Sequence, residues 1–114
     1  MTTFVSLWFA KAMGRDASIV TMCAEAVDLA SGPDTTPEVL DQLSRHPLAV
    51  VRRAVARNHR TRPSTLARMS RDVDSDVRYW VADNRHTHFF VRARMQGDIS
   101  QLVSTRAGAS LPPA

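Results

Sequence analysis

Arginine is the residue type with the greatest capacity for binding chemistry in this chain. Residues 42–71 contain eight arginines and no acidic residue, so this segment alone carries a net charge of +8. A guanidinium group binds a phosphate or a carboxylate as a planar fork. The segment therefore predicts a surface for phosphate groups or for an acidic partner. Six of its arginines make up the basic face considered below: Arg53, Arg57, Arg60, Arg62, Arg68 and Arg71.

Metal binding and catalysis find less support in the residues. Of the four histidines, His86 and His88 are two residues apart and close to Asp83, but neither a cysteine partner nor an HExxH spacing accompanies them. The chain also lacks a glycine-rich phosphate loop, a GxSxG motif and a Cys–His pair with an orienting group. Trp80 together with Asp83 is similar to the pair used by HEAT-like DNA glycosylases, although this chain is much shorter. We expect no enzymatic activity, no metal and no cofactor.

Length and composition set the class of protein. With 114 residues, 44% of them apolar, the chain is long enough for one globular domain. Cys23 is the only cysteine, which excludes a disulfide framework and favours a reducing compartment. The longest apolar run, residues 4–10 interrupted by Ser6, is far shorter than the roughly 20 residues that span a bilayer, and it lacks the basic n-region and cleavage site of a secretory signal. We expect a cytoplasmic protein without membrane contact.

The chain contains an internal repeat with a period of 26 residues. Ten of the 26 positions in residues 35–60 carry the same residue in residues 61–86. Weaker copies precede and follow these two, as is typical of terminal repeats that cap a stack. We therefore expect one domain over residues 1–103, with capping helices over 1–34, two clear repeats over 35–60 and 61–86, and a degenerate repeat over 87–103. Residues 104–114 are mostly small and include two prolines, which predicts a flexible tail.

Each repeat predicts a short helix, partly 3₁₀, followed by a longer one. Thr35 or Thr36 caps the first short helix, with Glu38 placed for a capping box after Thr35. The longer helices are expected at residues 49–57 and 75–83, and Asn58 and Asn84 end them, where asparagine tolerates left-handed backbone. An earlier helix begins near Asp16 and stops before Gly32. The expected core comprises Leu29, Leu40, Leu43, Val51, Val55, Leu66, Met69, Val77, Trp80 and Val81.

Residues 34–88 carry a pattern that includes Val51-Arg52, Val55-Ala56 and Asn58, and it recurs as Val77-Arg78, Val81-Ala82 and Asn84. This pattern resembles that of the leucine-rich repeat variant family. The resemblance implies an all-α, right-handed α-solenoid of three to four repeats, related to HEAT and armadillo proteins. The best-known member of that family carries a cysteine cluster for a [4Fe–4S] centre, which Cys23 alone cannot form. Solenoids as a class imply binding rather than chemistry.

Three functional expectations follow. First, the chain is an interaction module for a protein partner, in the manner of a small bacterial or phage regulator, and the alternative is nucleic-acid binding without sequence specificity through the basic face. Second, Arg52 and Arg78 pair with aspartates such as Asp74 or Asp76 in a ladder along the stack. Third, an apolar N-terminal helix either caps the stack or contacts a partner or a second copy of the chain; its residues are Phe4, Trp8 and Phe9.

Overall fold

The structure, a computed structural model, describes residues 19–109, and this part of the chain is helical without strands. Helix α2 (Ile19–Ser31) is followed by three pairs of a short and a longer helix. These are α3 (Pro37–Leu43) with α4 (Ala49–Arg57), α5 (Pro63–Met69) with α6 (Ser75–Asp83), and α7 (Phe89–Met95) with α8 (Gln101–Ala109). The predicted all-α class is confirmed, and α4 and α6 have the predicted bounds.

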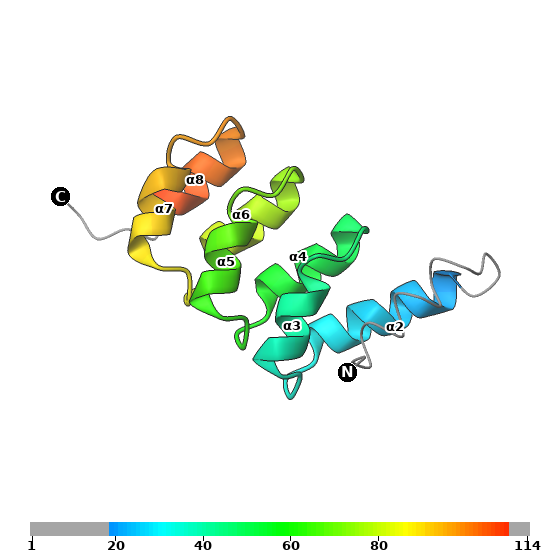
Figure 1. The fold of residues 1–114 in the computed structure, drawn as a ribbon. Helices are drawn as coiled ribbons and strands as arrows, with labels where there is room; N and C mark the ends of the chain where they lie inside the picture. Colours follow the sequence, from blue (N-terminus) through cyan, green and yellow to red (C-terminus); the bar gives the residue numbers. More distant parts are fainter. Residues whose placement is uncertain (1–18, 110–114) are drawn as a thin grey trace.

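The helices recur at the spacing of the sequence repeat. The short helices begin at residues 37, 63 and 89 and the longer ones at 49, 75 and 101, so both series advance by 26 residues. Each longer helix packs on the next, α2 on α4, α4 on α6 and α6 on α8, while each short helix packs beside the longer helix that follows it. The long helices form one layer and the short helices form a second layer beside it. In Figure 1 the successive helix pairs follow one another across the molecule from α2 to α8.

Local signals fix where the helices start. Thr36 caps α3, because its side chain accepts a hydrogen bond from the Val39 N–H, and a proline follows at the first helical position. Asp74 caps α6 in the same way. The alternative with Thr35 as the cap is wrong, since its hydroxyl donates to the Leu29 carbonyl of α2 instead. The short elements are also regular α-helices, so the expected 3₁₀ character is not observed.

The hydrophobic core runs along the contact between the two layers. Eight of the ten residues expected there are buried, while Leu29 and Trp80 are only partly buried against it. Val103 and Ala107 of α8 are completely buried as well. The prediction of a tail from residue 104 is therefore wrong for residues 104–109, which belong to α8. The mostly small residues of this segment did not indicate a helix in the sequence, yet Val103 and Ala107 occupy the repeat positions of Val77 and Val81.

Two asparagines join successive long helices. The Asn58 Nδ2 donates to the carbonyls of Ala30 and Gly32 at 2.8 and 2.9 Å, and the Asn84 Nδ2 donates to those of Ala56 and Asn58 at 2.8 and 3.1 Å. Both side chains are buried. Their backbone is extended, with φ of −77° and −71°, so the expected left-handed conformation does not occur. Each asparagine thus satisfies carbonyls at the C-terminal end of the preceding long helix.

Arginine–aspartate pairs form a second ladder. Arg52 binds Asp72 with its Nε 2.8 Å from Oδ2, and Arg78 binds Asp98 with the same distance. All four side chains are largely buried, and each arginine also donates to two backbone carbonyls of the preceding loop. The expected ladder exists, but the partners proposed for it, Asp74 and Asp76, are wrong. Arg52 binds Asp72, and Arg78 binds Asp98, the repeat equivalent of Asp72.

Candidate functional site

The structure distributes the basic face over both helical layers. Arg53 and Arg57 lie on α4, in the layer of long helices, whereas Arg68 lies on α5, in the layer of short helices. Arg62 precedes α5 as its N-cap residue. The remaining two, Arg60 and Arg71, are exposed in the segments before and after α5. The six side chains therefore do not line one continuous groove.

Ion pairs occupy half of the basic face. The Arg53 guanidinium lies 2.9 Å from Asp74 and 3.4 Å from Asp76, and Arg62 pairs with Glu38. Hydrogen bonds from Arg53 hold the pKa of the Asp74 carboxyl at about 2, against the opposing effect of its burial. The sequence could not reveal these partners directly, since they lie 21 to 24 residues away along the chain.

Arg68 is paired on the other layer. Its Nη2 lies 3.0 Å from the Asp41 carboxylate of α3 and 2.6 Å from the Ser44 hydroxyl. Asp41 also binds Arg45 at 2.9 Å and accepts a hydrogen bond from Thr65, also at 2.9 Å. Although burial alone would raise the pKa of this carboxyl, these bonds lower it. Asp41 is thus an anion held by two arginines and a hydroxyl.

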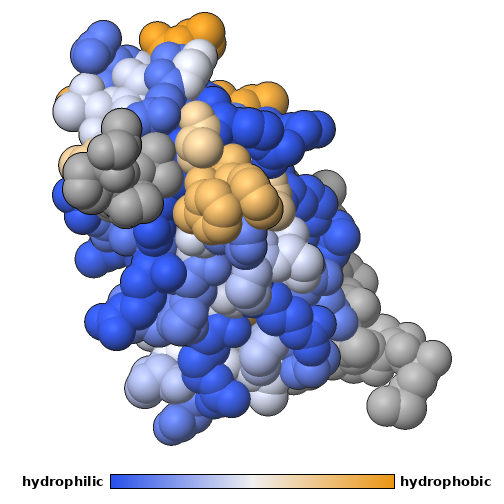
Figure 2. Space-filling view, turned by 90° about the vertical axis from the view of Figure 1, so that its left-hand side faces the viewer, coloured by the Kyte–Doolittle hydropathy of each residue, from blue (hydrophilic) through white to orange (hydrophobic). Residues whose placement is uncertain are grey.

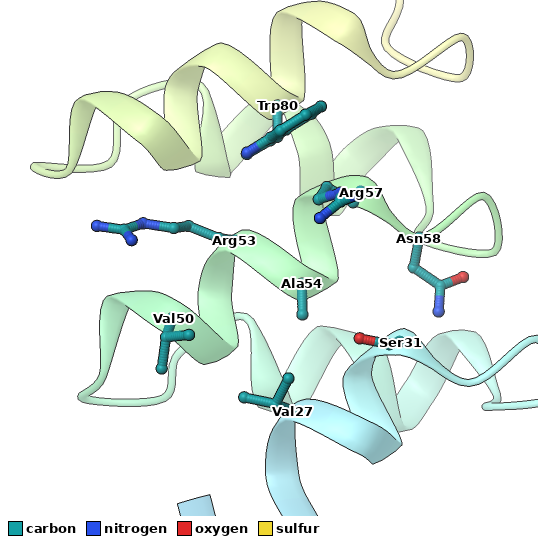
Figure 3. A pocket seen from close by; sticks show the side chains of 8 residues that line it. All are labelled: Val27, Ser31, Val50, Arg53, Ala54, Arg57, Asn58 and Trp80. Carbon is teal, nitrogen blue, oxygen red and sulfur yellow. The ribbon is translucent and has the colours of Figure 1, made fainter. Parts of the chain in front are cut away.

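A pocket of about 410 Å³ opens on the layer of long helices. Val27 comes from α2, Val50 and Ala54 come from α4, and Trp80 comes from α6, so the pocket spans three consecutive long helices (Figure 3). We call this surface the α2–α4–α6 face. The remaining lining residues are polar or charged: Ser31, Arg53, Arg57 and Asn58.

Arg57 and Trp80 form the most distinctive contact of this face. The Arg57 guanidinium lies 4.5 Å from the centre of the Trp80 ring, and Figure 3 shows the two side chains next to each other. A cation over an indole face is attracted by the ring quadrupole, which holds both groups in place. Among the described residues Arg57 forms no ion pair with a carboxylate, so its charge, unlike that of Arg53, is available to a ligand.

Trp80 was expected in the core, and its one suggested site role was the glycosylase-like pair with Asp83; the pocket and the contact with Arg57 were not expected. Its repeat equivalents, Ala54 and Arg106, are not aromatic, and this irregularity is the sequence signal that could have marked Trp80 as a candidate site residue. A second surface that the sequence did not predict lies at the start of α7, where Phe89 and Phe90 are 52% and 64% exposed. Figure 2 shows an apolar patch on this side of the molecule, surrounded mainly by hydrophilic residues.

The other candidates can be placed briefly. His46 is buried, and its Nδ1 accepts a hydrogen bond from the Leu48 N–H at 3.0 Å. Burial, followed by the charge of Arg52, lowers the pKa of His46 to about 4. Within residues 19–109 no group of three histidine, cysteine or acidic side chains could hold a metal ion. Phe4, Trp8 and Phe9 lie outside the described residues.

Comparison of the chain with protein-family models, curated proteins and solved structures finds no significant match. In the part of the chain that the structure describes, none of the helices has the length and apolar character needed to cross a membrane.

Proposed function

We propose that this chain is a non-enzymatic interaction module: a short, right-handed α-solenoid, akin to leucine-rich repeat variant units, that binds a protein partner on its α2–α4–α6 face. The 26-residue spacing of the helices and the packing of each long helix on the next support the solenoid architecture. Stacks of this kind present extended surfaces for binding.

The observation that carries the proposal is the composition of the pocket. Its walls are apolar, formed by Val27, Val50 and Ala54, and its edge carries Arg57 stacked on Trp80. Tryptophan and arginine are among the residues most enriched at the positions that dominate binding energy in protein interfaces. We expect a partner that inserts an apolar side chain into the pocket and places an acidic group next to Arg57.

Affinity capture from the cell of origin tests this proposal. Val50→Asp and Arg57→Glu change exposed side chains of the face, and Val73→Asp is a matched control because Val73 is 92% exposed in the loop before α6. A stoichiometric protein should be retained by the unmodified chain and by Val73→Asp, and lost by the two face variants. Equal capture by all four proteins would contradict the proposed face. Loss on Trp8→Ala instead would place the contact at the N-terminal segment.

Nucleic-acid binding is the alternative, supported by the exposed arginines that lack an acidic partner. Among the eight arginines of residues 42–71, Arg57, Arg60 and Arg71 form no ion pair within the described residues, while the other five do. With three phosphate contacts, a plot of the logarithm of the affinity for duplex DNA against the logarithm of the salt concentration should have a slope of about −3. Fluorescence anisotropy at several salt concentrations measures it. Tight binding with this slope, if it is lost when Arg57, Arg60 and Arg71 are all replaced by alanine, would favour the alternative.

A further inference from the structure

The two-layer repeat allows one anion-binding arrangement to be compared with its own copy 26 residues later. In the first copy Asp41 is held by Arg45, by Arg68 and by the Thr65 hydroxyl. Ser44 adds its hydroxyl, which accepts a hydrogen bond from Arg68 at 2.6 Å. The carboxylate of Asp41 thus pairs with two guanidinium groups that come from different repeats.

The second copy keeps the cations and loses the anion. Arg71 corresponds to Arg45, Arg94 to Arg68 and Ser70 to Ser44, but the position of Asp41 is taken by Ala67. Val91 likewise replaces Thr65. Within the described residues neither Arg71 nor Arg94 forms an ion pair with a carboxylate.

These two arginines meet at a pocket. A surface cavity of about 210 Å³ is lined by Ser70, Arg71, Arg94 and Met95, together with Gly97 and Asp98. The Asp98 carboxylate does not neutralise the pair, because both of its oxygens bind Arg78, at 2.8 and 3.2 Å. The cavity therefore presents two uncompensated guanidinium groups and has room for a carboxylate.

We propose that the Arg71–Arg94 pocket binds a carboxylate of an acidic segment in the protein partner, in the place that Asp41 fills internally one repeat earlier. The inference rests on the proposed protein-binding function, because a protein supplies the acidic side chain. It adds a second contact, which lies on the short-helix layer and not on the α2–α4–α6 face. A carboxylate is favoured over a phosphate because the first copy shows this geometry holding a carboxylate.

A titration with a blocked tetraglutamate peptide, followed by NMR of the arginine Nε–Hε signals, tests the pocket without the partner. The signals of Arg71 and Arg94 should shift with the peptide and remain unchanged with tetraglutamine. Ala67→Asp restores the missing acid, and it should weaken peptide binding about tenfold, the effect of losing a charge-assisted contact. Ala93→Asp is the matched control: it makes the same change of charge at the corresponding position of α7, and it should bind like the unmodified chain.

Three results would overturn the proposal: no shift with the peptide, equal weakening by Ala93→Asp and Ala67→Asp, or binding of inorganic phosphate and duplex DNA without binding of the peptide. The last result would assign the pocket to phosphate. Circular dichroism confirms that each variant is folded. If the partner is captured through the α2–α4–α6 face while the peptide does not bind, the proposed function stands and this inference fails. If the peptide binds at the pocket while no partner is captured through the α2–α4–α6 face, the pocket stands and the proposed face fails.

Discussion

Replacement of Asn84 by alanine removes a single side chain that connects two consecutive long helices. The Asn84 amide makes three hydrogen bonds: it donates to Ala56 and Asn58, and it accepts from the His86 N–H at 2.9 Å. Asn84 is only 4% exposed, so water does not readily replace these bonds. At about 1 kcal/mol for each bond that is lost with its partner left buried, Asn84→Ala should reduce the free energy of unfolding by about 3 kcal/mol.

Urea denaturation followed by circular dichroism at 222 nm measures this loss. Asn58→Ala should have a similar effect, because Asn58 makes the equivalent bonds to Ala30, Gly32 and Arg60. Arg85→Ala, an exposed neighbour, should change the stability by less than about 0.5 kcal/mol. A loss below about 1 kcal/mol for Asn84→Ala would refute the reasoning that these amides hold successive repeats together.

Three further predictions concern stability. The pKa of His46 is about 4 in the folded chain, below its ordinary value of 6.5, so the stability that its neutral form contributes is fully present above pH 6.5 and is lost as the pH falls toward 4. The free energy of unfolding should therefore be about 2 kcal/mol lower at pH 5 than at pH 7.5, and His46→Gln should remove this difference. Asp98→Asn breaks a largely buried ion pair and should cost about 3 kcal/mol in urea unfolding, whereas Glu38→Gln, in an exposed pair, should cost less than about 0.5 kcal/mol. Removal of residues 104–114 exposes the core beneath Ala107 and should lower the thermal midpoint by more than 10 °C in a calorimetric scan; an unchanged midpoint would show that α8 contributes nothing.

The sequence was sufficient for the local architecture. Apolar spacing and the 26-residue period predicted the bounds of α4 and α6 and most of the core. A short helix that buries one face carries apolar residues at helical spacing, and this pattern can be recognised in the sequence. The partners of polar side chains were not predictable to the same degree. Arg52 binds Asp72 and not Asp74, since the choice between two nearby aspartates depends on the path of the loop.

The charge of the basic face illustrates the same limit. Residues 42–71 contain no acid, yet Arg53, Arg62 and Arg68 are paired with acids that lie more than 20 residues away. The period of 26 residues brings those acids alongside. Local charge therefore overstated the basic surface. The ion pairs of the described residues show which arginines of this segment keep no acidic partner: Arg57, Arg60 and Arg71.

In-cell photo-crosslinking tests the proposed protein-binding face most directly. A photo-crosslinking amino acid replaces Val50 at the pocket in one protein and Val73 in a second, and both side chains are exposed. We predict that one protein species is crosslinked from position 50, that Arg57→Glu abolishes it, and that position 73 does not capture it. The same crosslinks from both positions, or crosslinked nucleic acid from position 50, would contradict the account.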